Sequence, residues 1–191
     1  MCALVDTAMR EGALGLSSSL QYVPDIFNST DEIIAMAKVA ARHGGAYFTH
    51  QRSESGRIDA SLDEVFRIAS EAGIRSQVWH LKTAYRPNFG RMPEILAKIE
   101  GARARGIDVS ANQYPWNRAS NGLDACLPPW SREGGRAELL KRLADPATRE
   151  RVKADMARES ADWENQWLGA GGGEGVMIAE VLAPQLKPYE G

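Results

Sequence analysis

The feature that most constrains the fold is a repeat of about thirty residues, in which a short apolar segment alternates with an amphipathic helical segment. Apolar runs typical of buried strands recur near residues 14, 46, 76 and 107. Each intervening segment has apolar residues at helical spacing and ends in glycine, at Gly44-Gly45, Gly73 and Gly106. This alternation predicts parallel strands joined by helical crossovers, so the expected fold class is α/β.

Helix-capping residues mark the start of the helical segments. Ser29-Thr-Asp-Glu32 and Ser61-Leu-Asp-Glu64 are capping-box sequences, in which a hydroxyl and a glutamate satisfy the first free amides of a helix. Pro93 suits the first turn of the third crossover helix, and residues 3–12 predict a further helix before the first strand. The apolar positions predicted to be buried in the second and third crossovers are Leu62, Val65, Phe66, Ala69, Ile95, Leu96, Ile99 and Ala102.

The repeat also predicts where functional residues lie. In parallel α/β folds, the loops at the carboxyl ends of the strands carry the chemistry. His50, Lys82, Tyr114 and residues 17–22 fall in such loops, and we expect them around a common opening. Periodicity alone does not distinguish a closed barrel from an open sheet, and a closed (β/α)8 barrel needs eight strands.

The pattern changes after Trp116. Residues 136–145 and 147–160 predict two charged amphipathic helices. Residues 163–170 and 176–181 are interpreted as two strands joined by a glycine-rich turn. The second part of the chain is therefore expected to be an insertion rather than a continuation of the repeat.

The composition excludes several classes of function. The 191 residues include 23 Lys and Arg against 25 Asp and Glu, a formal net charge of −2 without blocks of like charge, so a nucleic-acid-binding surface is not indicated. The N-terminus lacks a signal-peptide pattern, and no apolar run is long enough to cross a bilayer. Cys2 and Cys126 form no paired motif. The sequence thus predicts a cytoplasmic protein without membrane or nucleic-acid partners.

Two histidines occupy equivalent places in successive repeats. His50 closes the run that begins at Ala46, and His80 closes the run that begins at Gln77. If these strands are neighbours, both imidazoles reach one edge of the sheet, where they could share a metal ion or activate a water. The alternative is a purely structural histidine, which suits His43 at the end of a helix.

A basic residue follows each of these histidines at the same distance. Lys82 lies two residues after His80, and Arg52 lies two residues after His50. In an extended chain each would point to the same side as its histidine. A cation there could bind a substrate carboxylate or lie in solvent, and the pattern leaves both interpretations open.

Several segments match a known family in order. They are Gly12-Ala-Leu-Gly-Leu-Ser-Ser-Ser-Leu20, Thr49-His-Gln-Arg-Ser-Glu54, His80-Leu-Lys82, Asn88-Phe-Gly-Arg-Met-Pro93, Gln113-Tyr-Pro-Trp116 and Ala119-Ser-Asn-Gly-Leu-Asp124. Together they resemble the D-aminoacylases, which are N-acyl-D-amino-acid deacylases of the metal-dependent amidohydrolase superfamily. The resemblance is densest from residue 12 to residue 130.

The resemblance implies a fold, a reaction and a site. The fold would be a (β/α)8 TIM-type barrel, of which this chain supplies about four βα units, roughly strands 4–7. The reaction would be zinc-dependent hydrolysis of the amide bond of an N-acyl-D-amino acid, a small-molecule substrate. The implied metal ligands are His50 and His80. The expected substrate-binding residues are Tyr22, Lys82, Tyr114 and Ser120, of which Lys82 would face the substrate carboxylate. Arg52 is added to this set because of its position in the repeat.

The match to the family pattern is incomplete. The His-x-His motif of the first barrel strand is absent, and the general-base aspartate of the eighth strand is expected beyond residue 191, so no catalytic residue is assigned within the chain. We therefore expect a catalytically inactive fragment, divided into a partial barrel (1–130) and a helical insertion followed by the start of the next barrel segment (131–191). Two alternatives remain: a related amidohydrolase of cyclic amides or imides, and a non-catalytic half-barrel that self-associates through open sheet edges.

Overall fold

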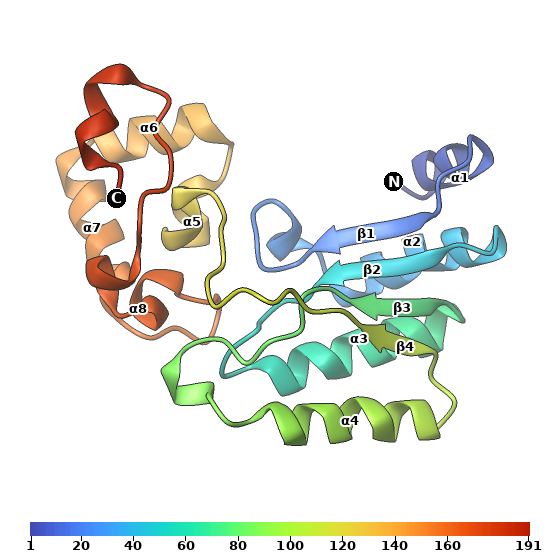
Figure 1. Cartoon of the computed structure of the whole chain (residues 1–191). Coiled ribbons are helices and arrows are strands. Elements are labelled where there is room, and N and C mark those ends of the chain that lie inside the picture. The colour runs from blue at the N-terminus through green and yellow to red at the C-terminus, as the bar shows by residue number, and fades with distance from the viewer. The chain divides into compact units, whose positions relative to one another are not determined.

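The computed structural model describes residues 1–191 and separates into two units, Met1–Trp116 and Asn117–Gly191 (Figure 1). The first unit contains the predicted α/β repeat. Its elements in chain order are α1 (Cys2–Arg10), β1 (Gly15–Ser19), η1 (Asp25–Phe27), α2 (Thr30–Arg42), β2 (Ala46–His50), α3 (Ile58–Ala72), β3 (Arg75–Val78), η2 (Arg86–Asn88), α4 (Met92–Ala104) and β4 (Val109–Ala111), where η denotes a 3-10 helix.

The four strands form one parallel sheet in the order β1-β2-β3-β4, so each strand pairs with the next one along the chain. The predicted α/β class and its parallel sheet are confirmed. Crossover helices α2, α3 and α4 pack on one face of the sheet (Figure 1). This connectivity places the carboxyl ends of all four strands at one edge.

Two apolar clusters fill the space between this sheet face and the helices. Tyr47 of β2 packs among residues of α2, and Val78 and Val109 of β3 and β4 pack among residues of α3 and α4. Because side chains alternate along a strand, a strand that turns Tyr47 towards the helices turns His50 towards the opposite face. The apolar repeat therefore fixes the side on which His50 emerges.

Two details of the predicted helices are corrected. The capping box at Ser29 is present, but α3 begins at Ile58, so Ser61 lies inside that helix and does not cap it. The Ser61 hydroxyl instead accepts a hydrogen bond of 2.8 Å from the backbone N–H of Ser53. Leu96 was predicted to be buried but is 47% exposed, since the buried stripe of α4 runs through Ile95, Ile99 and Ala102.

The second unit is helical. Its elements are η3 (Leu123–Cys126), α5 (Pro129–Arg132), α6 (Arg136–Ala144), α7 (Pro146–Met156), α8 (Gln166–Ala170), η4 (Gly172–Gly175) and η5 (Pro184–Tyr189). The two helices predicted from charge and periodicity correspond to α6 and α7. None of the helices in the structure has the length and apolar character needed to span a membrane.

The two strands predicted in this unit are wrong. Residues 166–170 form α8, because the Asn165 side chain caps the helix by accepting a hydrogen bond of 3.0 Å from the N–H of Leu168. Residues 176–181 form no strand. Apolar runs this short do not by themselves distinguish a strand from a helical turn. The predicted domain boundary at residue 130 stays a prediction, while the structure separates its two units at residue 116.

Candidate metal centre

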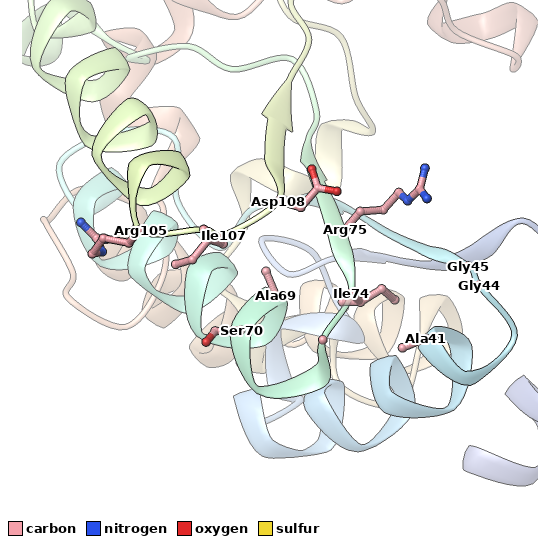
Figure 2. A pocket seen from close by; sticks show the side chains of 12 residues that line it. Ala41, Gly44, Gly45, Ala69, Ser70, Ile74, Arg75, Arg105, Ile107 and Asp108 are labelled. Atoms are coloured by element: carbon pink, nitrogen blue, oxygen red, sulfur yellow. The ribbon is translucent and has the colours of Figure 1, made fainter.

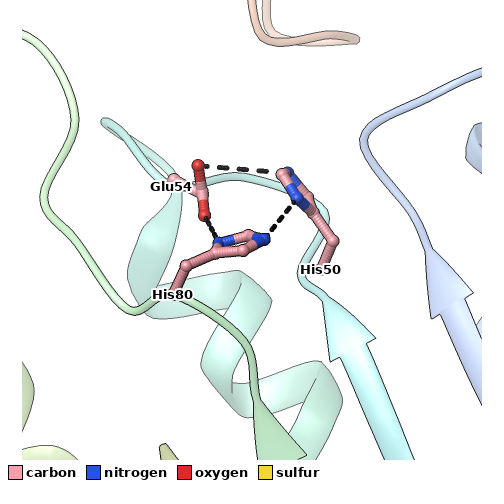
Figure 3. Close-up of side chains that lie close together, drawn as sticks. All are labelled: His50, Glu54 and His80. Atoms are coloured by element: carbon pink, nitrogen blue, oxygen red, sulfur yellow. Dashed lines mark hydrogen bonds and ion pairs between the residues drawn. The ribbon is translucent and has the colours of Figure 1, made fainter. Parts of the chain in front are cut away.

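The two predicted histidines lie at adjacent strand ends. His50 is the last residue of β2, and His80 follows the end of β3 by two residues. Because β2 and β3 are neighbours, with Thr49 paired to Val78, the two imidazoles meet at the carboxyl edge of the sheet (Figure 3). His50 Nδ1 lies 3.0 Å from His80 Nε2, and the ring centroids are 4.5 Å apart.

The backbone at His80 has an unusual conformation that directs its side chain. Its φ is 42°, in the left-handed region that residues other than glycine rarely adopt. The N–H of His80 donates to Asn112 Oδ1 at 2.6 Å, and the N–H of Leu81 donates to the Asn112 carbonyl at 2.8 Å. Asn112, which directly follows β4, thus holds the turn that carries His80. Sequence reasoning assigned no role to Asn112.

Glu54 is the most important residue that sequence reasoning missed. It lies in the loop after β2, and its Oε1 is 2.8 Å from His80 Nδ1 and 2.5 Å from Lys82 Nζ. Its Oε2 is 3.9 Å from His50 Nε2. The signal available in the sequence was its place in the loop that directly follows a strand-ending histidine, within Thr49-His-Gln-Arg-Ser-Glu54.

The environment of Glu54 keeps its carboxylate charged. Burial by itself would raise the pKa of Glu54, but the hydrogen bonds with His80 and Lys82 and the positive charge of Lys82 outweigh this and hold the pKa below its usual value. A charged carboxylate that is almost fully enclosed needs such partners. Glu54 therefore provides a fixed negative charge beside both histidines.

His50 remains a neutral imidazole at physiological pH. Burial is the main cause that lowers the pKa of His50 to about 4, against the opposing effect of the Glu54 carboxylate. The positive charge of Lys82 lowers it further. A neutral imidazole keeps one nitrogen lone pair, which is the form that binds a metal ion.

Three of the predicted substrate-binding residues lie around the histidine pair. Lys82 Nζ is 2.9 Å from His80 Nδ1 and 5.2 Å from the centre of the Tyr114 ring. The Tyr22 ring lies 4.8 Å from the His50 ring, and the Tyr114 ring lies 6.1 Å from the His80 ring. The strand-alternation argument for Lys82 is nevertheless wrong, because β3 ends at Val78; the turn at His80 directs the lysine instead.

Of the other two predicted residues, Arg52 has different partners and Ser120 belongs to the second unit. Arg52 donates to both carboxylate oxygens of Glu64, each at 2.9 Å, and to the carbonyls of Ile26 and Asn28, each at 3.0 Å. The hydrogen bonds to Glu64 raise the pKa of Arg52. Its guanidinium therefore joins α3 to the loop after β1 and does not contact the histidines. Ser120 is an exposed residue of the second unit.

The donor set at the histidine pair fits a zinc ion. Zinc in proteins prefers imidazole nitrogen, thiolate and carboxylate ligands, with zinc–nitrogen distances of about 2.0–2.1 Å. Two such nitrogens lie at most about 4 Å apart, and the 3.0 Å between His50 Nδ1 and His80 Nε2 is within that span. The potential ligand atoms of His50, Glu54 and His80 all lie within 4.8 Å of one another.

A cavity of about 470 Å³ lies at the opposite edge of the sheet (Figure 2). Its lining comes from the ends of α2, α3 and α4 and from the starts of β3 and β4, and it includes Arg75, Arg105 and Asp108. It contains no histidine, and it lies away from the strand ends where parallel α/β folds carry their chemistry. The histidine pair is therefore the better candidate site.

No family model matches the chain. The chain is 42% identical over 120 residues to a D-aminoacylase of Alcaligenes xylosoxydans xylosoxydans, covering 63% of this chain and 25% of that protein. It is 34% identical over 116 residues to an N-acyl-D-glutamate deacylase of the same organism, covering 61% and 24% respectively. Over about 60% of its length, this chain is therefore similar to the D-aminoacylases.

Solved structures agree with this similarity to the D-aminoacylases. A crystal structure of D-aminoacylase, which defines a subset of the amidohydrolases, superposes with a TM-score of 0.59 at 42% identity, covering 60% of this chain and 24% of that chain. An N-acyl-D-glutamate deacylase from Bordetella bronchiseptica, solved with zinc and a phosphonate inhibitor, gives a TM-score of 0.58 at 31% identity. The chain spans about a quarter of the length of the relatives that it matches.

Proposed function

We propose that this chain supplies part of the active site of a zinc-dependent hydrolase that cleaves the amide bond of N-acyl-D-amino acids. The observation that carries the proposal is the pair of imidazole nitrogens, His50 Nδ1 and His80 Nε2, that face each other at 3.0 Å at the carboxyl edge of a parallel sheet. The homology to deacylases, one of which was solved with zinc and a mimic of the tetrahedral intermediate, supports the choice of metal and reaction.

In this proposal His50 and His80 hold the metal. When bound, zinc polarises a carbonyl group and lowers the pKa of a water molecule, which are the two requirements of amide hydrolysis near neutral pH. Tyr22 and Tyr114 flank the histidine pair and would contact the acylated amino acid. Ser120 is retained in the proposed substrate-binding set from the family resemblance alone.

Lys82 is the proposed partner of the substrate carboxylate. The Lys82 side chain is 20% exposed, and its Nζ lies 2.5 Å from Glu54 Oε1 and 5.2 Å from the centre of the Tyr114 ring. An ammonium group has three N–H donors, so it can keep Glu54 and still donate to a carboxylate. A substrate with a free carboxylate, such as an acylated amino acid, would use that remaining capacity.

Two histidines do not complete a zinc site, because catalytic zinc ions generally have three protein ligands. The further ligand and the general base are not assigned to this chain. We therefore propose that the 191-residue chain by itself binds zinc weakly and does not deacylate N-acyl-D-amino acids.

Zinc binding by the purified chain tests this proposal. Equilibrium dialysis is expected to show weak binding that disappears in a His50→Ala/His80→Ala double variant. His43→Ala is the matched control, because it removes the third histidine, which pairs with Asp6 at 2.8 Å on the surface. Equal binding by the wild-type chain and the double variant would refute the metal assignment, and deacylation by the isolated chain would refute the proposed incompleteness.

A further inference from the structure

The exposed loop before η3 contains an asparagine that is followed directly by a glycine. Asn121 and Gly122 are both exposed, and they lie in a run of exposed residues, 117–124, that forms no helix or strand before η3 begins at Leu123. Asn121 is the only one of the six asparagines of the chain that precedes a glycine. The other five are followed by larger residues, in the pairs Asn28-Ser29, Asn88-Phe89, Asn112-Gln113, Asn117-Arg118 and Asn165-Gln166.

An asparagine side chain can react with the backbone nitrogen of the residue that follows it, because the two groups can close a five-membered ring. Asparagine is for this reason one of the thermolabile residues. A side chain on the following residue hinders the approach, whereas glycine has no Cβ and reaches many backbone conformations. The Gly122 carbonyl accepts a hydrogen bond of 2.9 Å from the Ala125 N–H, but the Gly122 N–H donates to no backbone carbonyl. The hydrogen bonds of η3 therefore do not hold the Gly122 nitrogen.

We propose that Asn121 is a site of spontaneous deamidation, which converts its side-chain amide to a carboxylate. The Gly122 nitrogen loses its proton and forms a bond to Asn121 Cγ, while the bond from Cγ to Nδ2 breaks, so that ammonia leaves and a cyclic imide remains. Water then adds to one of the two imide carbonyl carbons, and the bond from that carbon to the Gly122 nitrogen breaks. The product is aspartate or isoaspartate at position 121. Water is the only co-reactant, and no atom is oxidised or reduced.

Gln166 restrains the group that must leave. Asn121 Nδ2 donates a hydrogen bond of 2.7 Å to Gln166 Oε1, which ties the loop to the first residue of α8 within the second unit. This hydrogen bond is exposed, and water competes for both of its groups, so it opens at little cost. We therefore expect Gln166 to slow the reaction without preventing it.

Deamidation changes the charge and the contacts of the loop. The formal net charge of the chain becomes one unit more negative than its present −2. A carboxylate only accepts hydrogen bonds, so position 121 can no longer donate to Gln166 Oε1. In the isoaspartate form the main chain also runs through the former side-chain carbon, directly after Ser120. The histidine pair takes part in none of these steps, so the modification is independent of the proposed metal site.

Peptide mapping of the full chain by mass spectrometry tests the proposed modification. The purified chain is incubated at neutral and at mildly alkaline pH, and samples taken over time are digested with trypsin, which releases residues 119–132 as one peptide. The fraction of this peptide with aspartate or isoaspartate at position 121 should rise with time. It should rise faster at the higher pH, because the attacking nitrogen must lose its proton. A sample digested at time zero corrects for deamidation during the digestion.

Asn117 is the matched internal control. It lies in the same exposed run but precedes Arg118, and trypsin separates it from Asn121. The peptide that contains Asn117 should stay unmodified over the same time.

Two variants test the roles of the neighbouring residues. Gly122→Ala should lose most of the modified peptide. The φ of Gly122 is −66°, which alanine adopts readily, and the added Cβ would meet only the end of the Asp124 side chain, at 2.5 Å, which can rotate away. Gln166→Ala should increase the rate of modification, because it removes the hydrogen bond that holds Asn121 Nδ2.

The wild-type chain provides the result even if a variant does not fold, with the chain unfolded in guanidinium as the reference. An unmodified Asn121 in the folded chain would overturn the inference. If Asn121 of the unfolded chain is modified over the same time, the fold itself protects the site. Equal modification of Asn117 and Asn121 would also overturn the inference, because the glycine would then have no effect.

Discussion

Acidification of the metal-free chain from pH 6.5 to pH 4 is expected to destabilise it through His50. Burial of the imidazole is the main cause that lowers the pKa of His50 from 6.5 to about 4 in the folded chain. In the unfolded chain the side chain titrates near its ordinary value, so between these pH values the unfolded state binds a proton that the folded state does not. The stability contributed by His50 is therefore fully present above pH 6.5 and is lost as the pH falls towards 4.

The size of this loss follows from the shift. A difference of 2.5 pKa units (6.5 − 4), at about 1.36 kcal/mol per unit, gives a decrease of about 3 kcal/mol in the free energy of unfolding. A small domain has only about 5–15 kcal/mol of stability in total, so the change is large. Glu54 adds to the pH dependence only at lower pH, because its stabilising contribution is fully present above its usual pKa of 4.5 and is lost as the pH falls through its lowered folded-state value.

Urea unfolding followed by circular dichroism in the presence of a chelator measures the effect. The free energies of unfolding of the wild-type chain and of His50→Gln are compared between pH 4 and pH 7, and the wild-type chain should show the steeper decline. His43→Gln, at the surface pair with Asp6, is the control and should retain the steep decline. Parallel curves for the wild-type chain and His50→Gln would refute the argument that His50 is buried in its neutral form.

Two further predictions concern the first unit. Leu62→Ala should lower the free energy of unfolding by about 2–5 kcal/mol, because Leu62 is fully buried. Leu96→Ala should change the free energy of unfolding by less than about 0.5 kcal/mol, because Leu96 is exposed. Equal effects of the two variants in urea unfolding would contradict the observed orientation of α3 and α4. Arg52→Met should lower the free energy of unfolding by about 3 kcal/mol, because the Glu64 carboxylate loses both hydrogen bonds from Arg52. The zinc affinity of this variant, measured by dialysis, should stay unchanged. Loss of zinc binding in folded Arg52→Met would return Arg52 to the candidate site.

The parts of the fold that could be predicted are those that depend on periodicity. Parallel strands separated by helices of three or four turns leave a clear apolar pattern, and the ends of such strands must meet at one edge. The meeting of His50 and His80 follows from this rule alone. The errors occurred where the sequence offers only local signals: the second capping-box pattern lies inside α3, and the apolar run before Gly171 forms a helix capped by Asn165.

The contacts of Gln21 with His50, of Glu54 with His80 and of Asn112 with the turn at His80 could not be predicted in this way. All three lie in loops directly after strands, where no period relates one residue to the next. Their positions depend on how each loop folds back over the sheet edge. The family resemblance included Glu54 within a matching segment but did not indicate its hydrogen bonds with His80 Nδ1 and Lys82 Nζ.

The groups that orient the histidine pair all belong to the first unit. Gln21 follows β1, Glu54 follows β2, and Asn112 follows β4, so three of its four strands each contribute one group that fixes a histidine. The second unit supplies none of these hydrogen bonds. A chain shortened to residues 1–116 that still folds should therefore show the same histidine ring-proton chemical shifts as the full chain. A change of these shifts on removal of the second unit would mean that the pair depends on contacts outside this sheet.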